Sequence, residues 1–231
     1  IELPKVQRNF LKALKEAGKK VVFVNCSGSA IALTPETESC DAILQAWYPG
    51  QEGGEAVARV LFGEYNPAGR LPITFYRNSN QLPDFKDYSM KGRTYRYMND
   101  ALFPFGYGLS YTSFRIGDAT LSNSILKKGE KITLKVPVSN VGKKDGTEVV
   151  QVYVKDPADT EGPLKTLKAY QRIKVKAGAT AQAVITLDSK NFELFDAATN
   201  TVRAKAGKYE VYYGNSSADK DLKKIMVNYE Y

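Results

Sequence analysis

Carboxylates, lysines and tyrosines are the side chains through which this sequence could perform acid–base chemistry, because its 231 residues include no histidine. That composition excludes Ser-His-Asp and Cys-His catalysis and any histidine-ligated metal. The two cysteines, Cys26 and Cys40, are too far apart for a Cys-x-x-Cys motif. We therefore expect neither a metal site nor a redox cofactor. Whether the two cysteines form a disulfide is left open by their spacing.

Glu52 and Glu55 come nearest to a two-carboxylate hydrolase site. Glycoside hydrolysis with retention needs two carboxyl groups about 5–5.5 Å apart on elements that converge on the scissile bond. Residues three apart on one helix share a surface instead of flanking a substrate. We therefore expect these carboxylates to interact favourably with the positive N-terminal end of the helix dipole, and we assign them no catalytic role.

The two glutamates lie in an aromatic and glycine-rich stretch, residues 47–55. An aromatic pair, a glycine turn and a helix N-terminus could together grip an anion or a sugar ring. The favoured interpretation is structural, since glycines let a helix pack close to a strand. The residues given this structural role are Trp47, Gly50, Glu52 and Gly53.

Residues 92–97 place two arginines among aromatic side chains, with the sequence GRTYRY. Arg93, Tyr95 and Arg96 could form a platform for carbohydrate hydroxyls, or the tyrosine rings could be buried at a domain junction. The later stretch 103–112 is rich in aromatic residues and glycine, and its titratable groups are all tyrosines. We expect it to be a packed, irregular segment, with Phe105, Gly106 and Gly108 in structural roles.

The net charge of +8 comes from 33 Lys and Arg against 25 Asp and Glu, with most of the excess in the second half of the sequence. Those lysines are scattered singly between apolar residues, which is typical of the solvated face of strands. The pattern disfavours nucleic-acid binding, which would interleave arginines with stacking aromatics. No apolar run is long enough to span a membrane.

The first half alternates helix and strand signals. A helix is predicted from Pro4 to Gly18, a strand buried on both faces at residues 21–24, a second strand at 42–47 and a helix at 52–62. This order indicates an α/β layer with parallel strands. The chain also begins at Ile1, which suggests a piece of a longer protein. In that case the apolar flank of residues 21–24 should be exposed or covered by another chain.

The second half changes to a period of two from about Ile132, with short apolar runs separated by turn signals. This spacing is typical of a β-sandwich of roughly 100 residues. Residues 67–112 fit neither pattern and are expected to be ordered loops. We therefore expect an α/β domain at 1–114 and an all-β sandwich at 115–231.

Seven motifs occur in an order that resembles the carboxyl-terminal portion of glycoside hydrolase family 3, followed by a fibronectin type III-like domain. They cover nearly the whole chain. They lie at residues 46–54, 60–72, 103–112, 138–142, 146–154, 165–171 and 206–209.

The resemblance implies a retaining, exo-acting enzyme for β-linked sugars. In that family an aspartate nucleophile on an amino-terminal TIM-like barrel and a glutamate acid/base would both precede Ile1, so no catalytic residue is expected in this chain. The implied partners are an oligosaccharide, that barrel and the remainder of the α/β domain. No cofactor, nucleic acid or membrane span is implied, and the implied compartment is periplasmic or extracellular.

Residues 89–97 resemble the β-xylosidase branch of the family more than the β-glucosidase branch. On this resemblance Arg93, Tyr95 and Arg96 are the residues expected nearest the mouth of a substrate pocket. Two alternatives stay open: a β-glucosidase of the same family, and a non-catalytic carbohydrate-binding or structural module. The sandwich strands show no exposed row of Trp or Tyr, which counts against the module.

Overall fold

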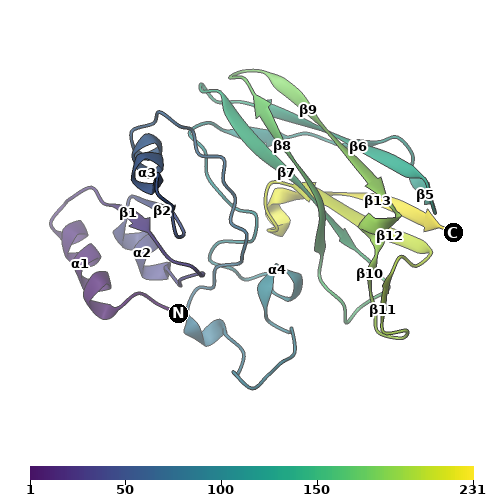
Figure 1. Cartoon of the computed structure of the whole chain (residues 1–231), viewed down its shortest axis with the longest axis horizontal. Coiled ribbons are helices and arrows are strands. Elements are labelled where there is room, and N and C mark those ends of the chain that lie inside the picture. Colours follow the sequence, from purple (N-terminus) through teal and green to yellow (C-terminus); the bar gives the residue numbers. More distant parts are fainter. The chain divides into compact units, whose positions relative to one another are not determined.

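The computed structural model describes all of residues 1–231, and the chain divides into two units (Figure 1). Unit 1 contains residues 1–65 and 72–105, and unit 2 contains residues 66–71 and 106–231. The chain therefore passes between the units three times. The boundary drawn from the sequence, between residues 114 and 115, falls inside unit 2.

Unit 1 carries the predicted helices and strands close to their expected positions. The helix α1 spans Lys5–Glu16. The strands β1 (Val22–Asn25) and β2 (Ala42–Gln45) run parallel, and Val22 lies opposite Ala42. The helix α3 spans Gly53–Leu61. Two short helices, η1 (Ser79–Gln81) and α4 (Thr94–Tyr97), lie within the long loops.

The helices η1 and α4 were not predicted, and neither was α2, which spans Thr34–Ser39. It has Pro35 in its first turn, where proline is tolerated, and Glu36 as its one buried residue. A six-residue helix with a single inward side chain shows no apolar period. Its only sequence signal was the proline followed by acidic residues.

The prediction that this strand is buried on both faces is wrong for all three apolar residues of β1, since Val22 is exposed and Phe23 and Val24 are half-buried. Val22 is 52% exposed, whereas Asn25 at the other end of the strand is buried. The cause is that β1 has β2 as its single hydrogen-bonded neighbour. The expectation that the apolar flank of residues 21–24 is exposed is confirmed at Val22, whereas Val21 is buried.

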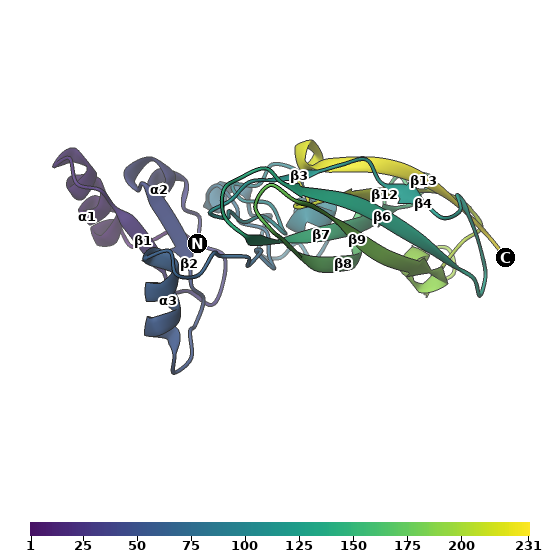
Figure 2. The same cartoon turned by 90° about the horizontal axis from the view of Figure 1, so that it is seen from above.

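Unit 2 is a sandwich of two antiparallel-rich sheets, in the order β5-β13-β12-β7-β8 and β3-β6-β4, with β9 paired to β6. Figure 2 shows its long strands running side by side along the unit. The strands are β3 (Phe114–Ile116), β4 (Thr120–Leu121), β5 (Ile125–Lys127), β6 (Lys131–Asn140), β7 (Gly146–Lys155), β8 (Thr166–Val175), β9 (Thr180–Asp188), β12 (Gly207–Gly214) and β13 (Leu222–Glu230). A small hairpin of β10 (Leu194–Asp196) and β11 (Thr201–Arg203) and the short helices η2 (Ser189–Phe192) and η3 (Asp219–Asp221) complete it.

The predicted alternation holds in β6 and β9, whose inward residues build one apolar core between the sheets. The strand β7 departs from it, because every residue from Glu148 to Val154 is buried. Residues 66–71 and 106–112 are bonded to this strand on its other face: Gln151 donates to the Gly106 carbonyl at 3.0 Å. A covered outer face removes the need for polar residues at alternate positions.

Candidate functional site

The segment Thr74–Tyr76 is the hub of the irregular half of unit 1. Phe75 is 1% exposed and packs edge-on against Trp47, with ring centroids 6.2 Å apart, and against Phe103, at 6.0 Å. The backbone N–H of Phe75 also donates to the Phe103 carbonyl at 2.9 Å. The loop after β2 and the segment ending at Phe105 are therefore fixed to one buried ring.

Two non-glycine residues bonded or packed to this hub have left-handed backbone, Trp47 with φ 59° and Thr94 with φ 56°. The N–H of Thr94 donates to the Tyr76 hydroxyl at 3.3 Å, and that of Tyr95 donates to Thr74 Oγ1 at 3.0 Å. Such conformations cost about 1–3 kcal/mol each and collect at functional sites. This strain, which the sequence did not signal, marks the hub and α4 as the candidate site.

Arg93 is used to hold a neighbouring loop. Its guanidinium donates to the carbonyls of Ser89 at 3.2 Å, Asp87 at 2.7 Å and Asp84 at 3.4 Å. Since a guanidinium has five donors in a fixed fork, these contacts fix the loop against the N-terminal end of α4. Tyr95 stacks on Phe105 with centroids 4.4 Å apart.

Arg96 differs from Arg93 because its guanidinium keeps a donor that is not used. The Arg96 Cζ lies 5.6 Å from the centre of the Tyr97 ring, and the buried Nε has no hydrogen-bond partner. A buried donor without an acceptor costs about 1–3 kcal/mol and is uncommon. Arg96 is therefore the predicted site residue that keeps an unused hydrogen-bond donor.

Residues 47–55 form the loop after β2 and the start of α3, and the backbone is closely packed at two glycines that contact this loop. A Cβ on Gly53 would collide with the Pro49 ring, and a Cβ on Gly28 would meet the Tyr48 ring at 2.5 Å. Gly50 has open space around it, and Glu52 precedes α3 without capping it through its side chain. Glu55 pairs with Arg59 one turn later at 2.6 Å, so the two glutamates do not form a carboxylate pair.

The stretch 103–112 is divided between the units after Phe105. Gly106 has φ +79°, and a Cβ on it would overlap the amide of Gln151, while a Cβ on Gly108 would lie 2.5 Å from the Gly69 carbonyl. Gln151 also accepts from the Tyr153 hydroxyl at 2.6 Å. Both glycines therefore sit where only a residue without a side chain fits.

Sequence reasoning missed two polar clusters. At the carboxyl ends of the parallel strands, Asn25 donates to Gln45 Oε1 at 2.6 Å and to Ser27 Oγ at 3.0 Å. In unit 2, Arg70 and Glu148 form a buried ion pair at 2.5 Å. The first cluster could have been predicted, because Asn25 and Gln45 are the last residues of two neighbouring parallel strands. The ion pair joins residues 78 apart in sequence, and no local pattern indicates it.

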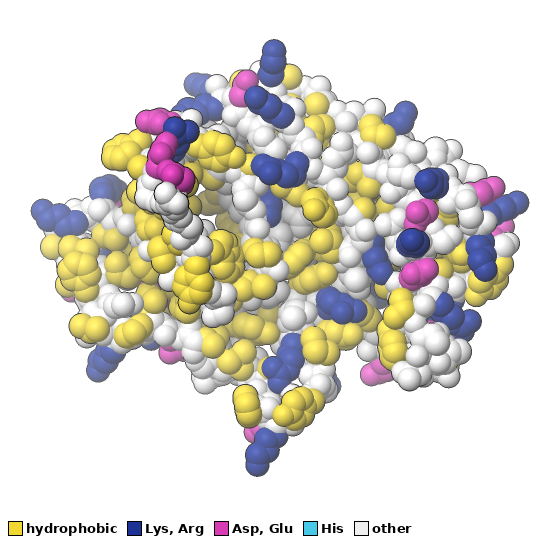
Figure 3. Space-filling model, in the orientation of Figure 1, with side chains coloured by type: hydrophobic (Ala, Val, Ile, Leu, Met, Phe, Trp, Pro, Cys, Tyr) yellow, Lys and Arg dark blue, Asp and Glu magenta, His cyan; other side chains and the backbone are white.

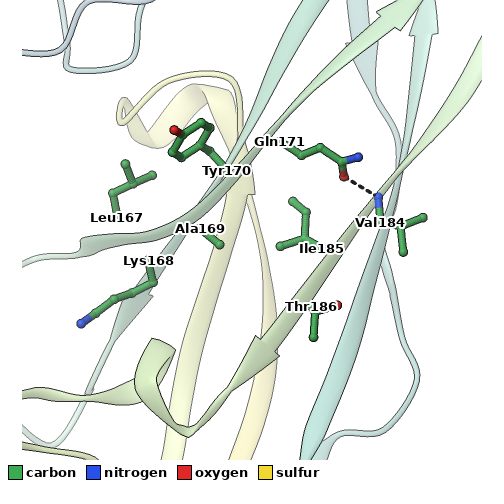
Figure 4. A pocket seen from close by; sticks show the side chains of 8 residues that line it. All are labelled: Leu167, Lys168, Ala169, Tyr170, Gln171, Val184, Ile185 and Thr186. Atoms are coloured by element: carbon green, nitrogen blue, oxygen red, sulfur yellow. Dashed lines mark hydrogen bonds between the residues drawn. The ribbon is translucent and has the colours of Figure 1, made fainter.

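A groove of unit 2, about 530 Å³, lies between the edge strands β8 and β9 (Figure 4). Gln171 reaches across it and accepts from the Val184 N–H at 2.7 Å, and the Tyr170 side chain points away from that bond. An amide bridging two edge strands caps the open side of a sandwich. The groove therefore offers a ligand few convergent polar groups.

Several further features bear on chemistry. Three or more Cys, Asp or Glu side chains do not gather anywhere in a metal-binding cluster. Cys26 is an exposed free thiol and Cys40 a buried one. Of the helices, none has the length and apolar character needed to cross a membrane.

Comparison with known domains divides the chain in the same order as its fold. Residues 1–111 match the glycosyl hydrolase family 3 C-terminal domain. Residues 148–217 match the fibronectin type III-like domain.

Two curated relatives align over almost the whole chain. A xylan 1,4-beta-xylosidase of Xylanibacter ruminicola is 62% identical, over 98% of this chain and 26% of the relative. A periplasmic beta-glucosidase of Salmonella typhimurium is 39% identical, over 94% of this chain and 30% of the relative. The chain thus spans less than a third of the length of these relatives.

Two solved structures share the fold of this chain. The beta-glucosidase of Listeria innocua in complex with isofagomine superposes with a TM-score of 0.85 at 29% identity, covering all of this chain and 34% of that one. The beta-glucosidase 3B of Thermotoga neapolitana also gives 0.85 at 29% identity, over 98% of this chain and 34% of that one.

Proposed function

This chain belongs to glycoside hydrolase family 3, with the family's C-terminal domain followed by a fibronectin type III-like domain, and from that premise we propose that it completes and braces the active site of a retaining β-xylosidase. The observation that carries the choice of sugar is the 62% identity to a xylan 1,4-beta-xylosidase, against 39% to a beta-glucosidase. Sugar preference depends on pocket contacts, which closely similar chains share.

The nucleophile and the acid/base of this enzyme lie outside the chain in our proposal. We assign neither role to Glu52 or Glu55, since Glu55 is 56% exposed and bonded to Arg59 on α3. The proposed contribution of the chain is to the wall of the pocket. There the Arg96 guanidinium would bind a sugar oxygen, while Arg93 and Tyr95 hold α4 in place.

The proposed partners within the whole enzyme are an amino-terminal barrel and further strands of the α/β sheet. Three exposed apolar side chains, one on β1 and two on α1, support the second partner. Val22 is 52% exposed, and Val6 and Phe10 on α1 are 74% and 62% exposed. We take this exposure to mark surface that further parts of the enzyme cover. We place the enzyme in the periplasm or outside the cell, in line with the relative named periplasmic.

A chimera tests the proposed function. The matching 26% of the Xylanibacter ruminicola enzyme is replaced by this chain, and hydrolysis of nitrophenyl β-xyloside and β-glucoside is compared. We expect the xyloside to be preferred, and the 231-residue chain alone to be inactive on both. A chimera that prefers the glucoside would assign the other sugar. Turnover by the isolated chain that Glu52→Gln abolishes would refute the upstream placement of catalysis.

A further inference from the structure

The loop between η1 and α4 exposes two aromatic rings almost completely. Phe85 is 93% and Tyr88 91% exposed, more than any other large apolar side chain of the protein. The loop lies below α4 in Figure 1, and the same tip in Figure 3 shows hydrophobic, basic and acidic side chains together. Aromatic rings held in water in this way mark binding surfaces, because their burial is strongly favourable.

The backbone that carries these rings is fixed in place. The Asp84 carboxylate accepts from the Lys86 N–H and the Asp87 carboxylate from the Ser89 N–H, both at 2.8 Å. The Asp87 N–H donates to the Asp84 carbonyl at 3.0 Å, and the Arg93 guanidinium bonds three carbonyls of the same loop. A preorganised loop loses little conformational entropy when it binds. The rings are therefore presented in advance of any ligand.

The polar groups around the rings point to a neutral ligand. Lys86 and Lys91 are exposed and balance Asp84 and Asp87, while Arg93 is committed to carbonyl groups. Lys86 and Asp87 separate the two rings in sequence, so each ring has a donor or an acceptor next to it. A β-linked sugar chain matches this pattern, since its C–H faces stack on rings and its hydroxyls both donate and accept.

We propose that the loop at residues 82–91 binds the distal units of a neutral β-linked xylo-oligosaccharide, with Phe85 and Tyr88 as stacking platforms. This assignment rests on the proposed function, because it extends recognition beyond the sugar that is cleaved. Stacking dominates the interaction, and charge contributes little.

Titration of the 231-residue chain with xylotetraose tests this assignment. Phe85→Ala and Tyr88→Ala should each weaken binding about five- to tenfold, and the double variant should abolish it. Raising the salt from about 50 to 500 mM should change the dissociation constant less than about twofold, because screening acts only on charge. Both side chains are exposed, so circular dichroism should show unchanged folding.

Phe62→Ala is the matched control, since Phe62 is 83% exposed at the end of α3 in the same unit. It should leave binding of xylotetraose unchanged. An equal loss in this variant, or no binding by the unmodified chain, overturns the proposal. So does a salt-sensitive affinity lost in Lys86→Gln, or sedimentation that shows Phe85 and Tyr88 joining two copies of the chain. If the chain binds xylotetraose but the chimera does not turn over its substrates, only the proposed function is rejected. If the chimera is active but the chain does not bind xylotetraose, only the proposed sugar binding by the loop is rejected.

Discussion

Thr94 is the residue at which the candidate site stores backbone strain. A β-branched side chain at φ 56° is unfavourable, and glycine adopts this region without that cost. Thr94 Oγ1 also accepts from the Arg96 N–H at 3.2 Å, a long hydrogen bond whose loss offsets part of the gain. The strain is thus relieved most directly by removing the side chain.

We predict that Thr94→Gly leaves the free energy of unfolding of unit 1 unchanged or raises it by up to about 1 kcal/mol. Thr37→Gly, in the middle of α2, is the control. It should lower the free energy of unfolding by about 1 kcal/mol, because glycine is the poorer helix former and the Thr37 hydroxyl no longer donates to the Thr34 carbonyl. Denaturant unfolding followed by tryptophan fluorescence measures both. Equal losses in the two variants would show that Thr94 is not strained.

Glu36 is the second residue with a distinct energetic signature. It is 1% exposed, its Oε2 has no partner, and Arg8 Nε lies 3.4 Å from its Oε1. Burial raises the pKa of this carboxyl above its ordinary 4.5, and its own backbone N–H and Arg8 offset part of that effect. A raised pKa means that folding favours the protonated form. The contribution of Glu36 to the stability of unit 1 is then fully present below pH 4.5 and is lost as the pH rises through the folded-state pKa.

We therefore predict that Glu36→Gln stabilises unit 1 at pH 7 and has little effect near pH 4. Glu38→Gln, on the exposed face of the same helix, should change stability at neither pH. Thermal melts at the two pH values provide the measurement. A Glu36→Gln protein that melts lower at pH 7 would indicate that the ion pair with Arg8 outweighs the burial of the charge.

At the scale of elements, local patterns predicted α1, β2, α3 and the sandwich, because each has an apolar period or a turn signal of its own. They failed for α2, which buries one residue, and for the second face of β7. Burial of that face depends on Gln151 meeting Gly106, 45 residues away in sequence. The strained φ angles of Trp47 and Thr94 likewise occur where these residues contact Phe75 and Tyr76, which are distant in sequence, so no local propensity reveals them.

The turn at Gly106 can be tested against another glycine with the same backbone. Gly106 and Gly129 both have positive φ, +79° and +88°, but only a Cβ on Gly106 meets another group, the Gln151 amide. Gly129→Ala should cost about 1 kcal/mol, from backbone strain alone. Gly106→Ala should cost about 2–4 kcal/mol, because overpacking adds to that strain.

Urea denaturation followed by far-ultraviolet circular dichroism measures these losses. Gly106→Ala should cost less stability in a Gln151→Ala protein than in the unmodified protein, because the side chain that the new Cβ meets is then shorter. The difference between the two costs is the coupling energy of the two positions. Equal costs for the two glycine variants would contradict the close contact.

At the scale of the whole molecule, the ordered motifs predicted the family and both domains, because each motif is a short contiguous stretch that can be identified in the sequence alone. What they did not predict is that residues 66–71 leave unit 1 and join unit 2. Asn66 donates to the Asp145 carbonyl at 3.0 Å, and Arg70 pairs with Glu148 on β7. These contacts span long stretches of sequence, so only the folded chain reveals them.

The Arg70–Glu148 pair should therefore stabilise one unit more than the other. Both side chains are buried, at 7% and 2% exposure, and Glu148 also accepts from the Val149 N–H at 2.7 Å. Arg70→Met leaves an unpaired buried carboxylate, for which we predict a loss of about 3–5 kcal/mol from unit 2. Adding Glu148→Met should recover part of this loss, because no buried charge then remains.

The single tryptophan, Trp47, lies in unit 1, and most strands lie in unit 2, so two signals separate the units. In urea, Arg70→Met should shift the unfolding followed by circular dichroism far more than the unfolding followed by tryptophan fluorescence. Lys223→Met removes an exposed ion pair with Asp118 and should shift neither signal appreciably. If both signals shift together in Arg70→Met, the two units unfold as one, and the short segment that joins unit 2 couples their stabilities.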